Sequence, residues 1–295
     1  MKYGSLWQRW TRGVSWTWVN DRFRDALPAD FDSGLMALDA PDRLHVKQGR
    51  STARVVFHTA DRGGPASDAT PRALAVYLKR HYRLPWPAGV AATIHPSGRH
   101  SPAAEEWAHL ERSRALGIDV PEVIAAGERI GPRARLTSFL MVAELTGCEA
   151  LHEALPRLAA RLDARAFATL KRRLIAEMAR IAATLHAAQL FHKDLYLCHF
   201  FLDTDRLERD GGAIRLVLID LHRLSSRRFW PDWLRWKDLG QLLFSTFDVD
   251  GIDDRDRLRF WRSYRRRCPV ALAPSQARIV RFRAARYRAH NRKPR

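Results

Sequence analysis

The sequence has few cysteines and no long hydrophobic run. Only three of its 295 residues are cysteines, Cys148, Cys198 and Cys268, and no CxxC pair occurs. This scarcity argues against a disulfide framework or a structural zinc site and favours a reducing compartment. No apolar stretch approaches the roughly 20 residues that a bilayer-spanning helix needs. Charged residues interrupt residues 1–21, which argues against a secretory signal. We therefore expect a soluble, intracellular protein.

Acidic residues are scarce relative to basic ones. The chain has 51 Lys and Arg residues against 32 Asp and Glu residues, a formal net charge of +19 at pH 7. A charge of this sign attracts nucleic acid, phosphorylated glycans or an anionic membrane face, and it does not choose among them. Residues 277–295 contain no acidic residue at all. Such a tail forms a solvated helix or a frayed end, or it docks on an anionic surface.

Tryptophan and arginine alternate near the N-terminus. The residues concerned are Trp7, Trp10, Trp16 and Trp18, together with Arg9, Arg12, Arg22 and Arg24. Aromatic rings beside guanidinium groups suit a membrane interface or an anionic partner. A strap packed on the first sheet explains the same residues equally well, so both interpretations stay open.

The patterning predicts a sheet-rich first half and a helical second half. Hydrophobic residues make up 46% of the chain, enough for a substantial core. In the first half, runs of β-branched and aromatic residues predict strands, a Gly- and Pro-rich stretch predicts a loop, and one segment reads as a helix. These are the strands 53–57, 73–78 and 136–145, the loop 61–71 and the helix 103–116.

In the second half, apolar residues recur at spacings of three and four between Phe167 and Leu185, which predicts a long amphipathic helix. The short apolar run 214–219 predicts a buried strand, and helices are expected near 233–247 and 253–267.

Two aspartates follow apolar elements in this second half. Asp194 comes shortly after the long helix, and Asp220 ends the apolar run 214–219. Two acids on neighbouring loops can divide the work of phosphoryl transfer, since one accepts a proton from the attacking hydroxyl and the other holds a divalent cation. His199 lies five residues after Asp194, so its loop could return it to the same cation.

These residues resemble a known family. His192-Lys193-Asp194 is similar to the catalytic loop H-R-D-x-x-x-x-N of protein-kinase-like folds, and Asp220 stands where such folds place the Asp of D-F-G. Three segments, 193–200, 220–223 and 235–240, more closely resemble the lipopolysaccharide core kinases, the Kdo/WaaP family of heptose kinases. The resemblance covers residues 40–265.

The resemblance implies a fold and a domain organisation. The fold would be α+β and two-lobed, with a small antiparallel-sheet lobe followed by a larger, mostly helical lobe. The chain then divides into a Trp/Arg-rich N-terminal extension, an N-lobe with the nucleotide-binding sheet and helix, a C-lobe with the catalytic and metal-binding loops, and a basic C-terminal tail. The respective ranges are 1–40, 41–145, 146–270 and 271–295.

The resemblance also implies roles for the C-lobe residues. Asp194 would be the catalytic base, and Asp220 would bind Mg²⁺ that bridges the ATP phosphates. His199 takes the place of the usual Asn, and because imidazole is a softer ligand than an amide oxygen, its metal contact is the less secure of the two. His192 would brace the catalytic loop, and Asp238 would hold that loop through its backbone N–H groups.

In the N-lobe the resemblance implies a nucleotide site. Lys79 would bind the α- and β-phosphates, with Glu106 as its partner from the helix and Glu105 as the competing candidate. The segment Gln48-Gly49-Arg50-Ser51-Thr52 lies where a Gly-rich phosphate loop belongs, yet it contains one glycine rather than three. Gly49 and the hydroxyls of Ser51 and Thr52 could still hold a phosphate.

The implied activity is an ATP-dependent transfer of the γ-phosphoryl group to a sugar of the lipopolysaccharide inner core, with heptose as the expected acceptor. The expected partners are that core or a related anionic glycan and an anionic membrane surface, with the chain at the cytoplasmic face of the inner membrane. Kdo or another glycan is the nearest alternative acceptor. A non-catalytic kinase-like scaffold and a nucleic-acid-binding protein are the alternatives from other classes, although no nucleic-acid-binding motif occurs in the sequence.

Overall fold

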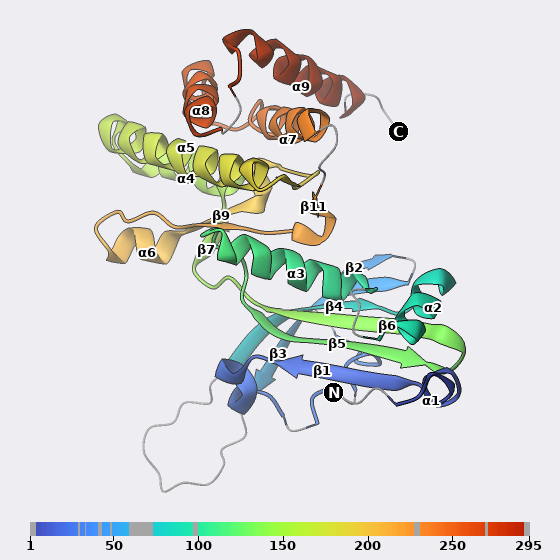
Figure 1. Ribbon diagram of the computed structural model, residues 1–295. Helices are drawn as coiled ribbons and strands as arrows, with labels where there is room; N and C mark the ends of the chain where they lie inside the picture. Colours follow the sequence, from blue (N-terminus) through green and yellow to red (C-terminus); the bar gives the residue numbers. More distant parts are fainter. Residues whose placement is uncertain are drawn as a thin grey trace, which may run out of the picture. The chain divides into compact units, whose positions relative to one another are not determined.

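The computed structural model places most of the chain, and Figure 1 traces it from end to end. The described residues are 4–28, 30–32, 34–40, 43–47, 49–58, 73–96, 100–226, 231–268 and 271–291. The expected loop 61–71 and Gln48 of the expected phosphate loop therefore lie outside the described residues.

By its internal contacts the chain forms two compact units. The N-terminal unit comprises Met1–Glu111 and Pro121–Leu145, and the C-terminal unit comprises Arg112–Val120 and Thr146–Arg295. The described helices include none that is both long and apolar enough to cross a bilayer.

The N-terminal unit is built on a six-stranded antiparallel sheet. Its spatial order is β1 (Val14–Val19), β5 (Val123–Gly131), β6 (Arg135–Ala143), β4 (Ala73–His81), β3 (Arg50–His58) and β2 (Arg43–Lys47). Alternate residues of β4 are buried, from Val76 through Leu78 to Arg80, as the two-residue period of a strand requires. The three expected strands are all present. Strands β3 and β4 extend beyond the expected bounds, whereas β6 begins one residue earlier and ends two residues earlier than 136–145.

The N-terminal segment is part of this sheet. Strand β1 pairs with β5 along its whole length, and the residues after it pack Leu27 and Leu35 into a core with Leu78 and Met141. The set-apart extension 1–40 therefore supplies an edge strand and a covering segment, because several of its apolar side chains from Val19 onward pack inside the unit. That packing favours the strap interpretation for residues 14–40.

Helices complete the N-terminal unit. They are α1 (Leu6–Thr11), α2 (Trp86–Ile94) and α3 (Pro102–Ala115), with 3-10 turns η1 (Asp21–Ala26) and η2 (Pro132–Ala134). The last residues of α3 belong by contacts to the other unit. Trp107 of α3 packs against Trp16 and Trp18 of β1, with ring centroids 6.2 and 4.5 Å away, so these half-buried tryptophans make contacts within the unit.

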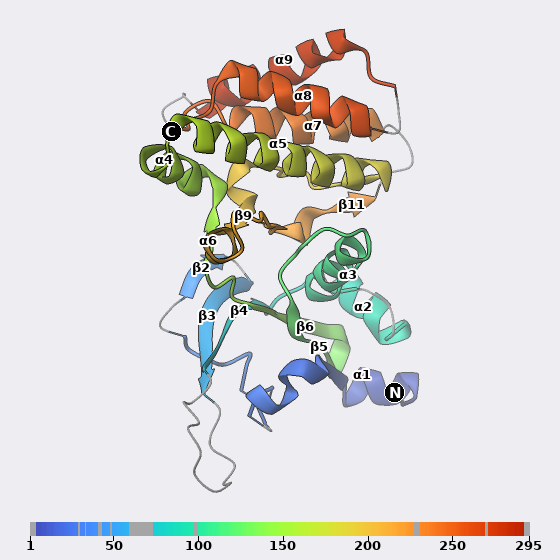
Figure 2. The same ribbon diagram turned by 90° about the vertical axis from the view of Figure 1, so that its left-hand side faces the viewer.

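The C-terminal unit is mostly helical. Its helices are α4 (Leu151–Arg161), α5 (Ala164–Ala187), α6 (Thr204–Arg209), α7 (Pro231–Phe244), α8 (Asp254–Arg267) and α9 (Ala277–Asn291). Helix α5 is the predicted amphipathic helix, and it buries Leu170, Leu174 and Met178 as expected. It packs along α8, while α7 packs along α9, as Figure 2 shows.

The basic tail is largely ordered as α9. Val280 and Ala284 are buried on the helix that packs along α7, while its arginines are mostly exposed. The tail is thus an integral helix of the C-terminal unit up to Asn291.

Short strands position the loops that carry the two aspartates. Strands β7 (Cys148–Ala150), β9 (Phe200–Asp203) and β10 (Leu216–Leu218) form one sheet, and β8 (Leu190–Phe191) pairs with β11 (Ser225–Ser226). Asp194 lies between β8 and the 3-10 turn η3 (Leu197–His199), and Asp220 lies between β10 and the turn η4 (Leu221–Arg223). The buried strand expected over 214–219 is shorter, at three residues.

Candidate active site

Asp238 anchors the loop that carries Asp194. Its side chain is fully buried, and it accepts hydrogen bonds from the backbone N–H groups of His192, over 2.8 Å, and Lys193, over 2.7 Å. His186 also contacts this carboxylate, with its Nε2 atom 3.3 Å from Oδ2. Because a buried carboxylate needs such donors, these contacts hold the loop in its conformation. Lys193 has a φ of 66°, in the left-handed region where a side chain carries a steric cost.

His192 connects the Asp194 loop to the Asp220 loop. Its Nε2 atom donates to the carbonyl oxygen of Ile219 over 3.0 Å, since a carbonyl can only accept. Burial lowers the pKa of His192, because desolvation disfavours the charged imidazolium. The ring stacks on His199, with centroids 5.6 Å apart. These contacts suit a neutral histidine that fixes two loops in register.

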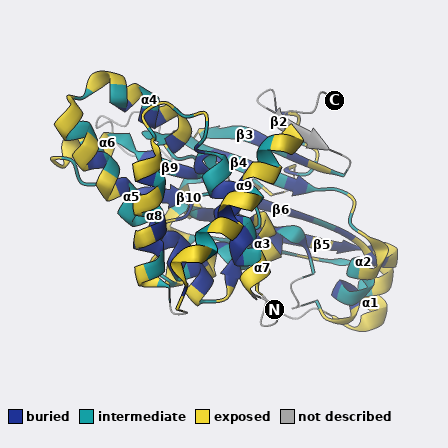
Figure 3. Cartoon of the chain, turned by 90° about the horizontal axis from the view of Figure 1, so that it is seen from above, coloured by how far each residue is buried: buried dark blue, intermediate teal, exposed yellow. Residues whose placement is uncertain are grey.

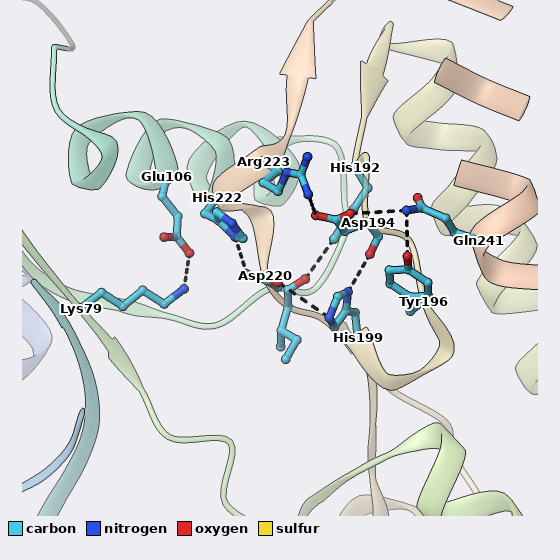
Figure 4. Close-up of polar contacts among 11 residues, drawn as sticks. Lys79, Glu106, His192, Asp194, Tyr196, His199, Asp220, His222, Arg223 and Gln241 are labelled. Atoms are coloured by element: carbon cyan, nitrogen blue, oxygen red, sulfur yellow. Dashed lines mark hydrogen bonds and ion pairs between the residues drawn. The ribbon is translucent and has the colours of Figure 1, made fainter. Parts of the chain in front are cut away.

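Two donors from outside the loop reach the carboxylate of Asp194. Arg223 Nη1 donates to Oδ2 over 2.6 Å, and Gln241 Nε2 donates to Oδ1 over 3.3 Å. Figure 4 shows both contacts. Gln241 also donates to the hydroxyl of Tyr196 over 3.0 Å, and burial raises the pKa of that phenol. The Asp194 carboxylate is therefore oriented from both sides while keeping lone pairs for a further ligand.

Asp220 and His199 face one another. Asp220 has a φ of 64°, and its Oδ1 atom accepts from His222 Nδ1 over 2.5 Å. The backbone carbonyl of Asp194 accepts a hydrogen bond from His199 Nδ1 over 2.7 Å. In the neutral imidazole this fixes the proton on Nδ1 and leaves Nε2 as an acceptor, 3.7 Å from Asp220 Oδ2.

This arrangement fits a cation. A neutral imidazole nitrogen and a carboxylate oxygen both present lone pairs, so their close approach is unfavourable by itself. A bound metal ion, or a proton on His199, would make it favourable. The described residues include no group of three or more His, Cys, Asp and Glu side chains arranged to hold a metal. Mg²⁺ does not require one, because it is often held by one or two carboxylates together with substrate phosphates and water.

The N-terminal unit contains a separate polar pair. Lys79 of β4 lies with its Nζ atom 2.5 Å from Glu106 Oε1 of α3, as Figure 4 also shows. The Glu106 side chain is 5% exposed and that of Lys79 is 23% exposed. Glu105, the competing candidate, is exposed to solvent. The structure thus pairs Lys79 with Glu106.

The residues of the expected phosphate loop divide between the two faces of the sheet. Thr52 lies opposite Lys79 in the register of β3 and β4, and Ser51 lies opposite Arg80. Cross-strand partners share a face, and consecutive residues alternate. Ser51 is buried, and its hydroxyl contacts Tyr82 Oη over 2.9 Å and accepts from Arg80 Nε over 3.1 Å. The Ser51 hydroxyl is thus engaged inside the unit, and these contacts do not support the expectation that it holds a phosphate.

Gly49 occupies the turn between β2 and β3. Its φ is 76°, and a Cβ atom there would approach the backbone oxygen of Arg83 to 3.1 Å. Glycine is required by this turn, and the carbonyl of Gly49 accepts from the backbone N–H of Tyr82 over 2.7 Å.

Comparison with known proteins identifies the family. The sequence model of the lipopolysaccharide kinase (Kdo/WaaP) family matches residues 50–264, more than half of the chain. The chain belongs to the lipopolysaccharide kinase (Kdo/WaaP) family. That range includes Lys79, Asp194 and Asp220, so the resemblance seen in the sequence is confirmed at the level of the family.

Individual relatives agree with this placement. The lipopolysaccharide core heptose(I) kinase WaaP of Pseudomonas aeruginosa is 35% identical over 175 residues, which cover 56% of this chain and 60% of that protein. The protein of the same name from Escherichia coli is 34% identical over 164 residues, covering 55% of this chain and 59% of the relative. The match thus spans less than two thirds of the curated relatives' length.

A solved structure resembles the fold. A chain described as WaaP in complex with acyl carrier protein superposes with a TM-score of 0.65 at 26% sequence identity, covering 94% of this chain and 100% of that chain. The predicted α+β, protein-kinase-like fold is confirmed.

Within this Kdo/WaaP-family chain, the structure adds site residues that the sequence analysis missed. Arg223, Gln241 and His222 each contact one of the two aspartates. A usable signal existed for Gln241, because it lies one helical turn after Asp238 and faces the same loop. Arg223 and His222 stand in the segment 220–223, but nothing in their spacing indicates which aspartate each one contacts.

Proposed function

We propose that this chain is an ATP-dependent kinase that transfers the γ-phosphoryl group to a heptose hydroxyl of the lipopolysaccharide inner core. Membership of the Kdo/WaaP family and the names of the two core heptose(I) kinases support the proposal. The observation that carries it is the carboxylate of Asp194, held on a loop anchored by the buried Asp238 and oriented by Arg223 and Gln241.

In the proposed reaction Asp194 orients the sugar hydroxyl and accepts its proton. A general base must lie within hydrogen-bonding reach of that proton, and both oxygens of Asp194 are held in fixed positions by donors. Asp220 and His199 would hold Mg²⁺ through a carboxylate oxygen and the Nε2 atom. When bound, this ion neutralises negative charge on the ATP phosphates.

In the N-terminal unit Lys79 would bind the α- and β-phosphates of ATP. Glu106 fixes the position of its ammonium group, because an ion pair orients a long side chain whose free rotation would otherwise weaken phosphate binding. Thr52, on the same face as Lys79, and the backbone around Gly49 are the proposed further contacts to nucleotide. Ser51 is not among them.

The proposed acceptor places the chain at a membrane. Lipopolysaccharide is a membrane lipid, and the net charge of +19 favours an anionic surface. We therefore propose that the chain acts as a peripheral protein at the cytoplasmic face of the inner membrane.

An acyl carrier protein is a second proposed partner. The solved WaaP neighbour is in complex with one, and the C-terminal unit contains a cavity of about 810 Å³. Its walls are mainly apolar, with Leu174, Met178 and Leu242 among them, and Arg257, Arg281 and Arg288 also line it. The apolar acyl chain of such a carrier suits a cavity with mainly apolar walls. Native mass spectrometry of the purified chain mixed with acylated and unacylated carrier tests this: a complex with neither form would reject the partner.

The experiment that tests the proposed function uses lipopolysaccharide that lacks core phosphate. The chain is incubated with this acceptor, ATP and Mg²⁺, and mass spectrometry of the released core locates any new phosphate. Phosphate on heptose is the expected result. Phosphate on Kdo or another sugar would change the acceptor while keeping the reaction, and the absence of any transfer by a chain that binds ATP would favour a non-catalytic scaffold.

A further inference from the structure

The exposed apolar side chains of the N-terminal unit gather on two helices. Nine large hydrophobic side chains are exposed in the described part of the chain, and five of them belong to α1 or α2. They are Leu6 (53% exposed), Trp7 (74%), Trp10 (38%), Trp86 (63%) and Ile94 (50%). Scattered exposed hydrophobics are ordinary, whereas a cluster on adjacent elements marks an interaction site. Figure 3 shows the extensive exposure of α1.

The two helices are held together as one surface. Arg9 of α1 donates from Nε to the carbonyl of Thr93 over 2.7 Å and from Nη2 to that of Ile94 over 3.5 Å. Its guanidinium group therefore caps the C-terminal end of α2. Ser5 and Gln8 form a capping box that starts α1. Figures 1 and 2 both place α1 beside α2.

Helix α2 is also seated closely on the turn η2. A Cβ atom on Gly89 would lie 1.8 Å from the carbonyl oxygen of Ala134, so only glycine permits this approach. The exposed side chains therefore lie on helices that are held against the rest of the N-terminal unit.

The charges around this surface are of one sign. Neither α1, α2 nor η2 contains an acidic residue. Arg12, Arg133 and Arg135 border the helices, are exposed, and form no ion pair with another described residue. Cations that are not neutralised by the protein itself are available to an external anion.

We propose that α1 and α2, together with these arginines, form the surface through which the chain binds the anionic lipid bilayer. Tryptophan is the residue type that accumulates at the lipid–water interface. Short apolar faces rimmed by arginine lie in that interface, with the apolar side chains among the acyl chains and the guanidinium groups at the phosphates. The inference deepens the proposed function, since it rests on an acceptor carried by a membrane.

Vesicle binding tests the surface. The full chain is sedimented with vesicles of phosphatidylglycerol and phosphatidylethanolamine, and in parallel with vesicles of phosphatidylcholine. We expect binding to the anionic vesicles that weakens in high salt, and at least about tenfold weaker binding for the double variant Trp7→Ser/Trp86→Ser. The matched control is Trp233→Ser in α7, because the Trp233 side chain is 57% exposed and lies outside α1 and α2. This variant should bind like the unmodified chain.

Two outcomes would overturn the inference. One is an unmodified chain that does not sediment with anionic vesicles, which would leave a protein partner as the occupant of this surface. The other is a double variant, folded by circular dichroism, that binds as tightly as the unmodified chain, which would place the membrane contact elsewhere.

Activity measurements separate this inference from the proposed function. With lipopolysaccharide embedded in vesicles, the double variant should lose transfer activity, whereas with the soluble, deacylated core oligosaccharide it should keep that of the unmodified chain. If neither acceptor is phosphorylated by any form of the protein, the proposed function fails, while the vesicle experiment still decides the membrane surface.

Discussion

Arg223 donates a hydrogen bond to Asp194 over 2.6 Å, and so connects the loop after β10 to the loop before η3. The two residues come from different sequence motifs, and the contact makes one cation a neighbour of the proposed base. The side chain of Arg223 is 49% exposed, so the guanidinium group is accessible from solvent while it orients the carboxylate.

Replacing Arg223 should slow transfer without weakening nucleotide binding. In Arg223→Gln the Asp194 carboxylate loses its charged donor, and we expect kcat to fall on the order of 100-fold, because a preorganised charged contact at the reacting group contributes to transition-state stabilisation. Arg223→Lys should recover part of the loss. Initial rates and nucleotide titration measure both quantities, and a large rise in the Kd for ATP with unchanged kcat would contradict this role.

The buried carboxylate of Asp238 should stabilise the folded chain. Asp238→Asn replaces one acceptor oxygen by an NH₂ group facing a backbone N–H, and we expect the free energy of unfolding to fall by about 2–4 kcal/mol. Urea denaturation measures the change. Asp248→Asn is the control, because that side chain is 80% exposed. Equal stability of the two variants would show that the backbone contacts of Asp238 are not important.

The two faces of β3 should respond differently to substitution. Ser51→Ala removes the acceptor of the Nε–H group of the buried Arg80, so we expect a stability loss of about 1–2 kcal/mol with unchanged affinity for ATP. Thr52→Val should weaken ATP binding and leave stability nearly unchanged. Thermal unfolding and calorimetric titration separate the effects, and weaker ATP binding in Ser51→Ala alone would reverse the assignment of the faces.

Parts of this organisation follow from the sequence alone. The spacing of apolar residues predicts α5 because a helix buried on one side needs that period, and the order of Lys79, Asp194 and Asp220 indicates a kinase-like site. Both predictions rest on patterns within the sequence itself and do not require knowledge of contacts between distant segments.

Other parts depend on contacts between distant segments. The tryptophans of residues 1–40 could serve a membrane or pack on the sheet, and only the pairing of β1 with β5 assigns Trp16 and Trp18 to contacts within the unit. The same holds for Ser51, because strand alternation predicts that it and Thr52 point apart but not which of them faces Lys79. The contact from Arg223 to Asp194 depends on the path of two loops, which spacing does not encode.

The ion pair between Arg54 and Glu144 should make stability depend on pH. The hydrogen bond from Arg54 is the largest cause that holds the pKa of Glu144 below its usual value. The folded state therefore binds fewer protons than the unfolded state over the acidic range, and stability falls as pH decreases through that range. When the pH decreases from 6 to 3.5, the Glu144→Gln variant should lose less stability than the unmodified chain. These two pH values bracket the usual glutamate pKa of about 4.3.

Thermal unfolding at several pH values measures this difference. The matched control is Asp254→Asn, because Asp254 also pairs with an arginine, Arg257, but its side chain is 97% exposed. A Glu144→Gln variant whose midpoint falls as steeply with acid as that of the unmodified chain would exclude this ion pair as the source.

Single-turnover transfer to the dephosphorylated core tests most directly whether Asp194 is the base of a kinase. The unmodified chain, Asp194→Asn and the exposed-site control Asp248→Asn are each saturated with ATP and Mg²⁺, and phosphate on the core is followed with time. We predict transfer by the unmodified chain and the control, and loss of about 100-fold or more in rate for Asp194→Asn with ATP still bound. Transfer by Asp194→Asn at the rate of the unmodified chain would show that Asp194 is not the base.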